Sequence, residues 1–510
     1  MTSSFLRTLA FLVPGLVLLP LGALAQQPAS EPCLYVNVDT LPLAYSGPGL
    51  GITTQGRING KPATLLVDTG AFETMLTRTG AERHGLRLRY AKATAYGVGG
   101  LSRIYTARVD EFATGPADMK RTELRVIGDT ATPPSFDGLA GAPFLLQADL
   151  EFSLPTKEIK FFRPSNCQDR FLAYWDENAV VLPFEPSSSD SPNPEFTVLL
   201  NGQKLRAIID SGASRTSVSL DAARRAGLKL DAPGVERLGD VTGIGTARVA
   251  HWAAMFDTLQ IGAETIRQAE IGVIDTNRLK IDVILGADFL RAPRVLFAMS
   301  QQRLYLSYIG GEPLGQRRRI EPWIQNEADL GNADAQMFLA NAYLDGKQPD
   351  APKGKAWLER AARGGNPEAN GRTGRQLMRE GRYAEAAQRL RKALDALPSA
   401  RYHALWLYGA RVRSGQAELG KRELETVFAR ETDEWPGPIA RYYLGKMDEE
   451  DLLEEARGDR QRARHQVCLV RRHIVERLGF DGASARLEAA KAQALLDCSS
   501  DKTSDRTAAN

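Results

Sequence analysis

Two short motifs of the same kind hold the residues best suited to chemistry. They begin at Asp68 and Asp210, 142 residues apart, and each directly follows a run of aliphatic residues. Two carboxylates held a few ångströms apart cannot both ionise, so they share one proton. One carboxylate then acts as a base on a bridging water, while the other donates to a substrate carbonyl. The pair predicts hydrolysis by an activated water, provided that the fold brings Asp68 and Asp210 together.

The residues after each aspartate are suited to support such a pair. Gly70 and Gly212 supply tight turns that allow close approach of the backbone. Each aspartate is expected to lie in its own lobe of the fold. The hydroxyls of Thr69 and Ser211 are predicted to hydrogen-bond across to the opposite lobe and hold the two turns together.

Both motifs end in alanine, at Ala71 and Ala213, so neither offers a hydroxyl there to stabilise an ionised carboxylate. Without that hydrogen bond, the apparent pKa values of the pair should be higher. We therefore expect activity at mildly acidic to near-neutral pH.

The motifs lie within an internal repeat. Residues 59–71 align with residues 201–213 without a gap, and Gly85-Leu86 matches Gly227-Leu228 at the same offset. Each copy reads as two strands joined by an Asn-Gly turn, followed by a short helix closed by glycine. The sequence therefore predicts two copies of one strand-based domain.

A glycine-rich hairpin follows the short helix in each copy. A flexible hairpin can close over a bound peptide and exclude water. Tyr96, at the base of the first hairpin, is suited to reach over the pair toward a substrate; a half-exposed strand tyrosine is the equal alternative. The predicted flap residues are Gly97, Gly99 and Gly100 in the first copy and Gly243 and Gly245 in the second.

With these motifs the sequence resembles two tandem retropepsin-like aspartic protease domains, of the cellular and bacterial branch, over roughly residues 35 to 310. The likeness rests on the Asp-[Thr/Ser]-Gly-Ala motifs and on the downstream Leu139-Ala140-Gly141 and Ile284-Leu285-Gly286. It implies a small β-barrel per domain, one catalytic aspartate in each, and an active site where the two meet. It also implies a peptide or protein substrate. A pair of lobes that binds peptide without cutting it is the alternative.

From about Glu321 the chain becomes rich in Ala, Leu, Arg and Glu. Residues 331–335 recur as residues 365–369, offset by 34, and this pattern resembles Sel1-like and tetratricopeptide repeats, which stack helix pairs. Such arrays bind protein segments, so a protein partner is predicted here; a module that only stabilises the protease is the alternative. Later helices are expected over Ile439 to Leu453 and Arg460 to Leu478.

These features predict a multidomain chain: mainly-β, two-lobed acid-protease-like barrels followed by an all-α helical repeat domain. We expect a signal peptide (1–25), a first lobe (30–165) and a second lobe (178–310). A linker (311–320), the helical repeats (321–498) and a disordered tail (499–510) follow.

The first residues have the charged, apolar and Ala-x-Ala layout of a cleavable secretory signal. An N-terminal anchor helix is the alternative, but the uninterrupted apolar run falls short of the ~20 residues that a span needs. We expect a periplasmic or secreted protein without a stable membrane span after signal cleavage. Four cysteines allow three pairings there. Cys33 with Cys167 and Cys468 with Cys498 is the favoured one, and free buried thiols are the alternative.

Composition excludes several other classes. The 65 Lys and Arg nearly balance the 62 Asp and Glu, which argues against a nucleic-acid partner. Neither the four cysteines nor the five histidines show metal-ligand spacing, so no metal and no cofactor is predicted.

Overall fold

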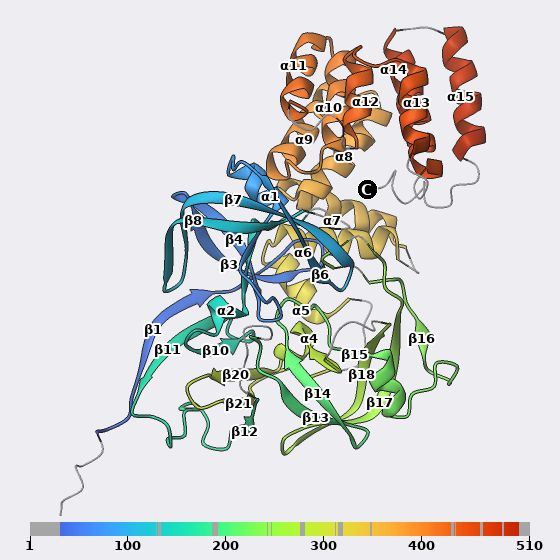
Figure 1. The fold of residues 1–510 in the computed structure, drawn as a ribbon. Helices are drawn as coiled ribbons and strands as arrows, with labels where there is room; N and C mark the ends of the chain where they lie inside the picture. Colours follow the sequence, from blue (N-terminus) through green and yellow to red (C-terminus); the bar gives the residue numbers. More distant parts are fainter. Residues whose placement is uncertain are drawn as a thin grey trace, which may run out of the picture.

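The computed structural model describes residues 31–128, 130, 134–185, 192–241, 243–245, 247–275, 281–311, 313–314, 320–346, 349–429, 433, 435–458, 463–481 and 484–498. The predicted signal peptide and tail lie outside these residues. As predicted, two β-rich regions with barrel-like sheets precede an all-helical region (Figure 1).

The first lobe is an eight-stranded sheet that closes on itself through a pairing of β3 with β7. Its strand order is β2-β3-β4-β9-β5-β8-β7-β6. The strands are β2 (Ala44–Ser46), β3 (Gly51–Ile58), β4 (Lys61–Asp68), β5 (Met75–Thr77), β6 (Arg89–Gly97), β7 (Gly100–Thr114), β8 (Ala117–Ile127) and β9 (Gly138–Gly141).

The second lobe repeats this plan with seven strands, in the order β13-β14-β19-β15-β18-β17-β16, and closes through β13 and β17. In both lobes the strand before the aspartate pairs in parallel with the strand before the downstream glycine, β4 with β9 and β14 with β19. The strands are β13 (Phe196–Leu200), β14 (Gln203–Ile209), β15 (Ser217–Ser219), β16 (Glu236–Arg237), β17 (His251–Ile261), β18 (Glu264–Ile274) and β19 (Val283–Leu285).

Each lobe also has two short helices, one after its β5- or β15-type strand and one after the downstream glycine. Thr77 and Ser219 cap the first of them by accepting from the amides of Gly80 (3.0 Å) and Ala222 (3.3 Å). The helices are α1 (Arg78–Arg83), α2 (Ala142–Leu145), α3 (Leu220–Arg225) and α4 (Ala287–Leu290).

A third sheet joins the two lobes, and the sequence analysis did not predict it. Each lobe contributes three strands in the order β1-β11-β10-β20-β21-β12, and β10 meets β20 where Leu150 lies opposite Phe297. The strands are β1 (Leu34–Pro42), β10 (Asp149–Ser153), β11 (Glu158–Ser165), β12 (Val180–Pro183), β20 (Pro293–Ala298) and β21 (Arg303–Tyr308). This sheet fixes the lobes relative to one another.

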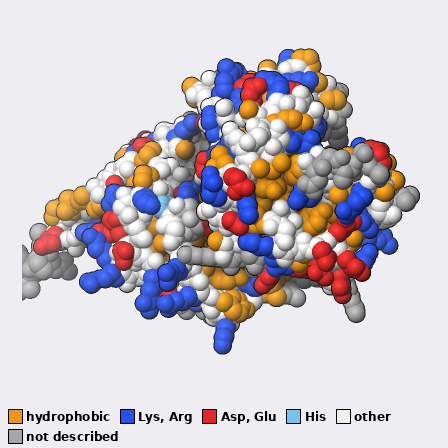
Figure 2. Space-filling model, turned by 90° about the horizontal axis from the view of Figure 1, so that it is seen from above, with side chains coloured by type: hydrophobic (Ala, Val, Ile, Leu, Met, Phe, Trp, Pro, Cys, Tyr) orange, Lys and Arg blue, Asp and Glu red, His pale blue; other side chains and the backbone are white. Residues whose placement is uncertain are grey.

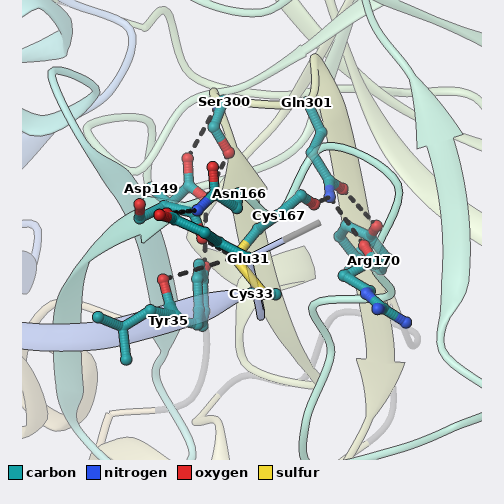
Figure 3. The surroundings of a disulfide bond; sticks show 12 residues. Glu31, Cys33, Tyr35, Asp149, Asn166, Cys167, Arg170, Ser300 and Gln301 are labelled. Atoms are coloured by element: carbon teal, nitrogen blue, oxygen red, sulfur yellow. Dashed lines mark hydrogen bonds between the residues drawn. A yellow bond between two sulfur atoms is a disulfide. The ribbon is translucent and has the colours of Figure 1, made fainter. Parts of the chain in front are cut away.

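The two expected disulfides are present, Cys33–Cys167 and Cys468–Cys498. Figure 3 shows the first, which ties the start of β1 to the segment after β11. Beside it, Asp149 accepts hydrogen bonds from Tyr35 Oη (3.3 Å) and from the Ser300 amide (2.9 Å). Within the described part of the chain, none of the helices has the length and apolar character needed to cross a membrane.

The helical region packs consecutive antiparallel helices. They are α5 (Pro322–Asp329), α6 (Ala333–Leu344), α7 (Ala351–Arg363), α8 (Pro367–Arg379), α9 (Tyr383–Ala396), α10 (Tyr402–Arg413), α11 (Ala417–Val427), α12 (Gly437–Tyr443), α13 (Glu449–Gly458), α14 (Ala463–Asp481) and α15 (Ser484–Cys498). Asn332 and Asn366, at the predicted offset of 34, cap α6 and α8 in the same way. Seen from above, acidic, basic and apolar side chains are interspersed (Figure 2).

The single helix expected over Ile439 to Leu453 is wrong. The chain forms α12 and α13 instead, with Gly445 between them at a φ of 69°. This left-handed conformation ends helices, and glycine adopts it without strain. The repeat families suggested by the sequence remain predictions.

The first helices of this region pack into the core of the lobes. Ile324 and Leu339 belong to one apolar cluster with residues of both lobes. Leu314, in the segment predicted as a linker, is also only 3% exposed, so that part of the segment is packed rather than solvated. The helices α5 and α6 therefore share a hydrophobic core with the lobes, whereas the later helices form an apolar cluster of their own.

Candidate active site

The fold brings Asp68 and Asp210 together. Asp68 ends β4, and Asp210 directly follows β14, so each leaves its sheet at the same topological point of its lobe. A Cβ atom placed on Gly70 would overlap the Asp210 carboxylate, and one on Gly212 would overlap that of Asp68. Each glycine thus permits an approach that any side chain would prevent.

The hydroxyls of the two motifs cross between the lobes. Thr69 Oγ1 donates to the carbonyl of Ile209 (2.8 Å) and accepts from the Ser211 amide (3.0 Å). Ser211 Oγ donates to the carbonyl of Val67 (2.7 Å) and accepts from the Thr69 amide (3.1 Å). Both side chains are buried. These four reciprocal bonds form the floor beneath the aspartates.

Each carboxylate is also held by its own turn through backbone amides. Oδ1 of Asp68 accepts from Gly70 and Ala71 (3.0 and 2.9 Å), and Oδ1 of Asp210 accepts from Gly212 and Ala213 (2.8 and 3.1 Å). The two alanines therefore contribute amides where the sequence analysis noted only a missing hydroxyl.

The pKa values of both Asp68 and Asp210 are raised above the ordinary carboxyl value. Both residues keep some accessible surface, yet protein surrounds their carboxyl groups, and this burial raises the pKa of Asp68 well above its ordinary value. The charge of Asp210 and a hydrogen bond to it raise the Asp68 pKa further. Burial raises the pKa of Asp210 too, and backbone amides oppose the rise at both residues. The pKa values are raised, as expected from Ala71 and Ala213, but the main cause is burial of the carboxyl groups and not the missing hydroxyls.

The predicted flaps of the two lobes meet each other. Gly97 and Gly100 end the strands of the β6–β7 hairpin, and between them the carbonyl of Gly99 accepts from the amide of Ala247 in the second lobe (2.7 Å). A Cβ on Gly245 would overlap the backbone of Gly99. The flaps are therefore in direct backbone contact.

Ile244 and Tyr96 lie beside the flap glycines of the second and first lobe. Ile244, next to Gly243, packs on a first-lobe apolar cluster that also touches Ala71. Tyr96 lies opposite Leu101 on the hairpin and is 39% exposed, so its contact with substrate remains a prediction.

Sequence analysis missed Asn193, which is 6% exposed and lies at the floor of the site. Its amide donates to the carbonyls of Thr69 and Ile209. At the repeat offset of 142 its counterpart is Gly51, so the internal repeat gave no signal for this residue.

We also considered a second cavity and a metal site as alternatives to the aspartate pair. A polar cavity of about 340 Å³ lies between the first lobe and the starts of α6 and α8, away from the aspartates. Among the residues that the structure describes, no group of three or more His, Cys, Asp or Glu side chains is placed to hold a metal ion.

Comparison with known proteins points to the same pair of regions. A family model described as aspartyl protease matches residues 54–144 and residues 196–289. The two matches are consistent with tandem protease domains, and each spans one of the aspartate motifs. The chain is thus similar to aspartyl proteases in both lobes. A search of curated proteins found no match.

Proposed function

We propose that the protein is an exported aspartic endopeptidase whose dyad is Asp68 and Asp210. The observation that carries this proposal is the mutual approach of the two carboxylates over a floor of reciprocal hydrogen bonds. The aspartyl protease match over both lobes supports a hydrolase.

The proposed reaction uses the unequal protonation of the pair. Asp210 takes a proton from a water as the water oxygen bonds to the peptide carbonyl carbon, and Asp68 gives its proton to the carbonyl oxygen. The tetrahedral intermediate then breaks its C–N bond as Asp210 gives its proton to the leaving nitrogen and Asp68 takes back a hydroxyl proton, which leaves a carboxylic acid, an amine and the starting dyad. No cofactor is required, and the flaps exclude bulk water during the reaction.

The supporting roles follow the same geometry. Thr69 and Ser211 brace the dyad, and the helical region recruits a substrate or protein partner. Export is supported by the signal-like N-terminus of the sequence and by the two disulfides, which are typical of oxidising compartments.

The test is cleavage of a mixed peptide library by the wild-type protein and by Asp68→Asn and Asp210→Asn. Each substitution should reduce cleavage by at least about 10²–10⁴-fold, because it removes one half of the acid–base pair. Asp118→Asn, a change at an exposed residue of the first lobe, is the matched control and should cleave normally. Cleavage that survives both dyad substitutions would contradict the proposal.

The second candidate is an inert peptide-binding protein. The backbone contact between Gly99 and Ala247 favours it, because flaps that touch each other restrict entry to the site. Peptides that bind the wild-type protein and both dyad variants equally, without cleavage by any of them, would establish this second function.

A further inference from the structure

Asn193 forms a strap across the two active-site turns. Its Nδ2 donates to the Thr69 carbonyl in the first lobe and to the Ile209 carbonyl in the second (3.0 Å). Both neighbours are carbonyl oxygens, so the amide nitrogen must face them and the side-chain orientation is fixed. Ile209 already accepts from Thr69 Oγ1, so the strap joins the hydroxyl floor.

The bond to the Thr69 carbonyl bears directly on the dyad. That carbonyl and the Gly70 N–H belong to one planar peptide unit and point in opposite directions. The Gly70 N–H donates to Oδ1 of Asp68 at 3.0 Å. The bond from Asn193 to the Thr69 oxygen therefore fixes the direction of the Gly70 N–H. A hydrogen bond accepted at the carbonyl of a peptide also strengthens donation by its N–H.

The strap breaks the internal symmetry of the site. Strand register equates the lobes at an offset of 142, because the Thr54–Leu65 pair of β3 and β4 corresponds to the Phe196–Ala207 pair of β13 and β14. At this offset the counterpart of Asn193 is Gly51, which has no side chain to offer. The Thr69–Gly70 peptide therefore receives a side-chain amide, whereas its counterpart, the Ser211–Gly212 peptide, cannot receive one from Gly51.

The side chain of Asn193 also lowers the stability of the folded protein in one respect. Its Oδ1 is buried and has no hydrogen-bond donor among the described residues. A buried acceptor without a donor costs roughly 1–3 kcal/mol, which an apolar residue would avoid. Such a residue would, however, take from the Thr69 carbonyl the donor that holds the Thr69–Gly70 peptide.

We infer that Asn193 is a positioning residue that orients the Thr69–Gly70 peptide so that its N–H donates to the Asp68 carboxylate. This inference rests on the proposed function for its kinetic consequence, but the orientation of the peptide is a property of the folded protein whether or not it cleaves substrate.

The kinetic test uses Asn193→Ala and Asn193→Leu, neither of which has a side-chain donor. In both variants kcat should fall about tenfold to hundredfold with KM within about twofold, as expected when reacting groups are slightly misplaced. The basic limb of the pH–rate profile should move to higher pH, because a weaker amide bond stabilises the Asp68 carboxylate less. Asn201→Ala removes an amide from a turn of the same lobe far along β13, and it should leave kcat and the profile unchanged.

A second measurement does not need activity. Labelling with ¹³C-threonine and ¹⁵N-glycine selects Thr–Gly peptide bonds, and the Gly70 amide proton should shift upfield in either Asn193 variant but not in Asn201→Ala. A wild-type protein that cleaves nothing overturns the proposed function and leaves this measurement to decide the inference. Asn193→Leu, which fills the site and cannot donate a hydrogen bond, decides it if Asn193→Ala does not fold. An unchanged Gly70 signal together with an unchanged pH profile would overturn the inference.

Discussion

Arg83, at the end of α1, donates to the carbonyl oxygen of Ala396, at the end of α9, over 2.7 Å. The same guanidinium pairs with Asp137 at 2.5 Å. Asp137 in turn accepts from the amide of Thr64, which lies in β4, the strand that ends at Asp68. One side chain therefore connects the helical region to the strand that carries Asp68. Nearby, Arg401 pairs with Glu82 at 3.1 Å.

The second lobe contains the same brace without the helical contact, which provides a matched pair of substitutions. Arg225 pairs with Asp282 at 2.5 Å, but both side chains are more exposed, 48% and 21%, against 29% for Arg83 and 3% for Asp137. Arg83→Ala removes the arginine partner of the buried Asp137 carboxylate and should lower the free energy of unfolding by about 3 kcal/mol. Arg225→Ala should cost under about 1 kcal/mol.

Calorimetry and limited proteolysis measure this difference. Arg83→Ala should also make the junction between the lobes and the helices easier to cut, whereas Arg225→Ala should not. Equal destabilisation by the two variants would show that the contact with Ala396 does not fasten the helical region.

The raised pKa of Asp68 predicts how the stability of the protein depends on pH. Between the ordinary carboxyl pKa of 3.8 and the raised folded-state pKa, the folded protein binds more protons than the unfolded chain. The free energy of unfolding therefore falls as pH rises through this window, and that stabilisation is fully present only below the unfolded-state pKa. Asp68→Asn keeps an oxygen for the Gly70 and Ala71 amides but cannot ionise.

Asp68→Asn should therefore be more stable than the wild-type protein at pH 8, and the difference should vanish near pH 3.5. Chemical denaturation across this range measures it, with Asp118→Asn as the control at an exposed site. A stability difference that is the same at both pH values would contradict the burial of the Asp68 charge.

The two disulfides should differ in their contribution to stability. Cys33–Cys167 closes 134 residues and Cys468–Cys498 closes 30. The chain-entropy relation then gives upper estimates of roughly 5 and 3.6 kcal/mol. Replacing both cysteines of the first pair by serine should lower the unfolding temperature of the β-rich part, while replacing the second pair should affect only the end of the helical region. Calorimetry with residue-resolved hydrogen exchange distinguishes the two.

The sequence was informative where one local pattern repeats. Asp68 and Asp210, their hydroxyl neighbours and the downstream glycines all appear twice at nearly one offset, so the lobes and their meeting point were predictable. The joining sheet was not, because β10 and β20 are short buried strands whose partners lie far apart in the sequence. Asn193 was missed for the opposite reason: it has no counterpart in the repeat, so symmetry gave it no signal.

Contact between the flaps predicts that Gly245 matters more than other glycines with similar backbone. Gly245 has a φ of 101° and lies against the Gly99 backbone, whereas Gly202 has a φ of 79° with open space around it. Alanine at either position costs of order 1–3 kcal/mol of backbone strain. At Gly245 it must also push the flaps apart, so Gly245→Ala should change kcat/KM by about tenfold or more, and Gly202→Ala should change only stability. Peptide cleavage measured beside thermal unfolding separates these effects, because strain alone would make the two variants alike in both.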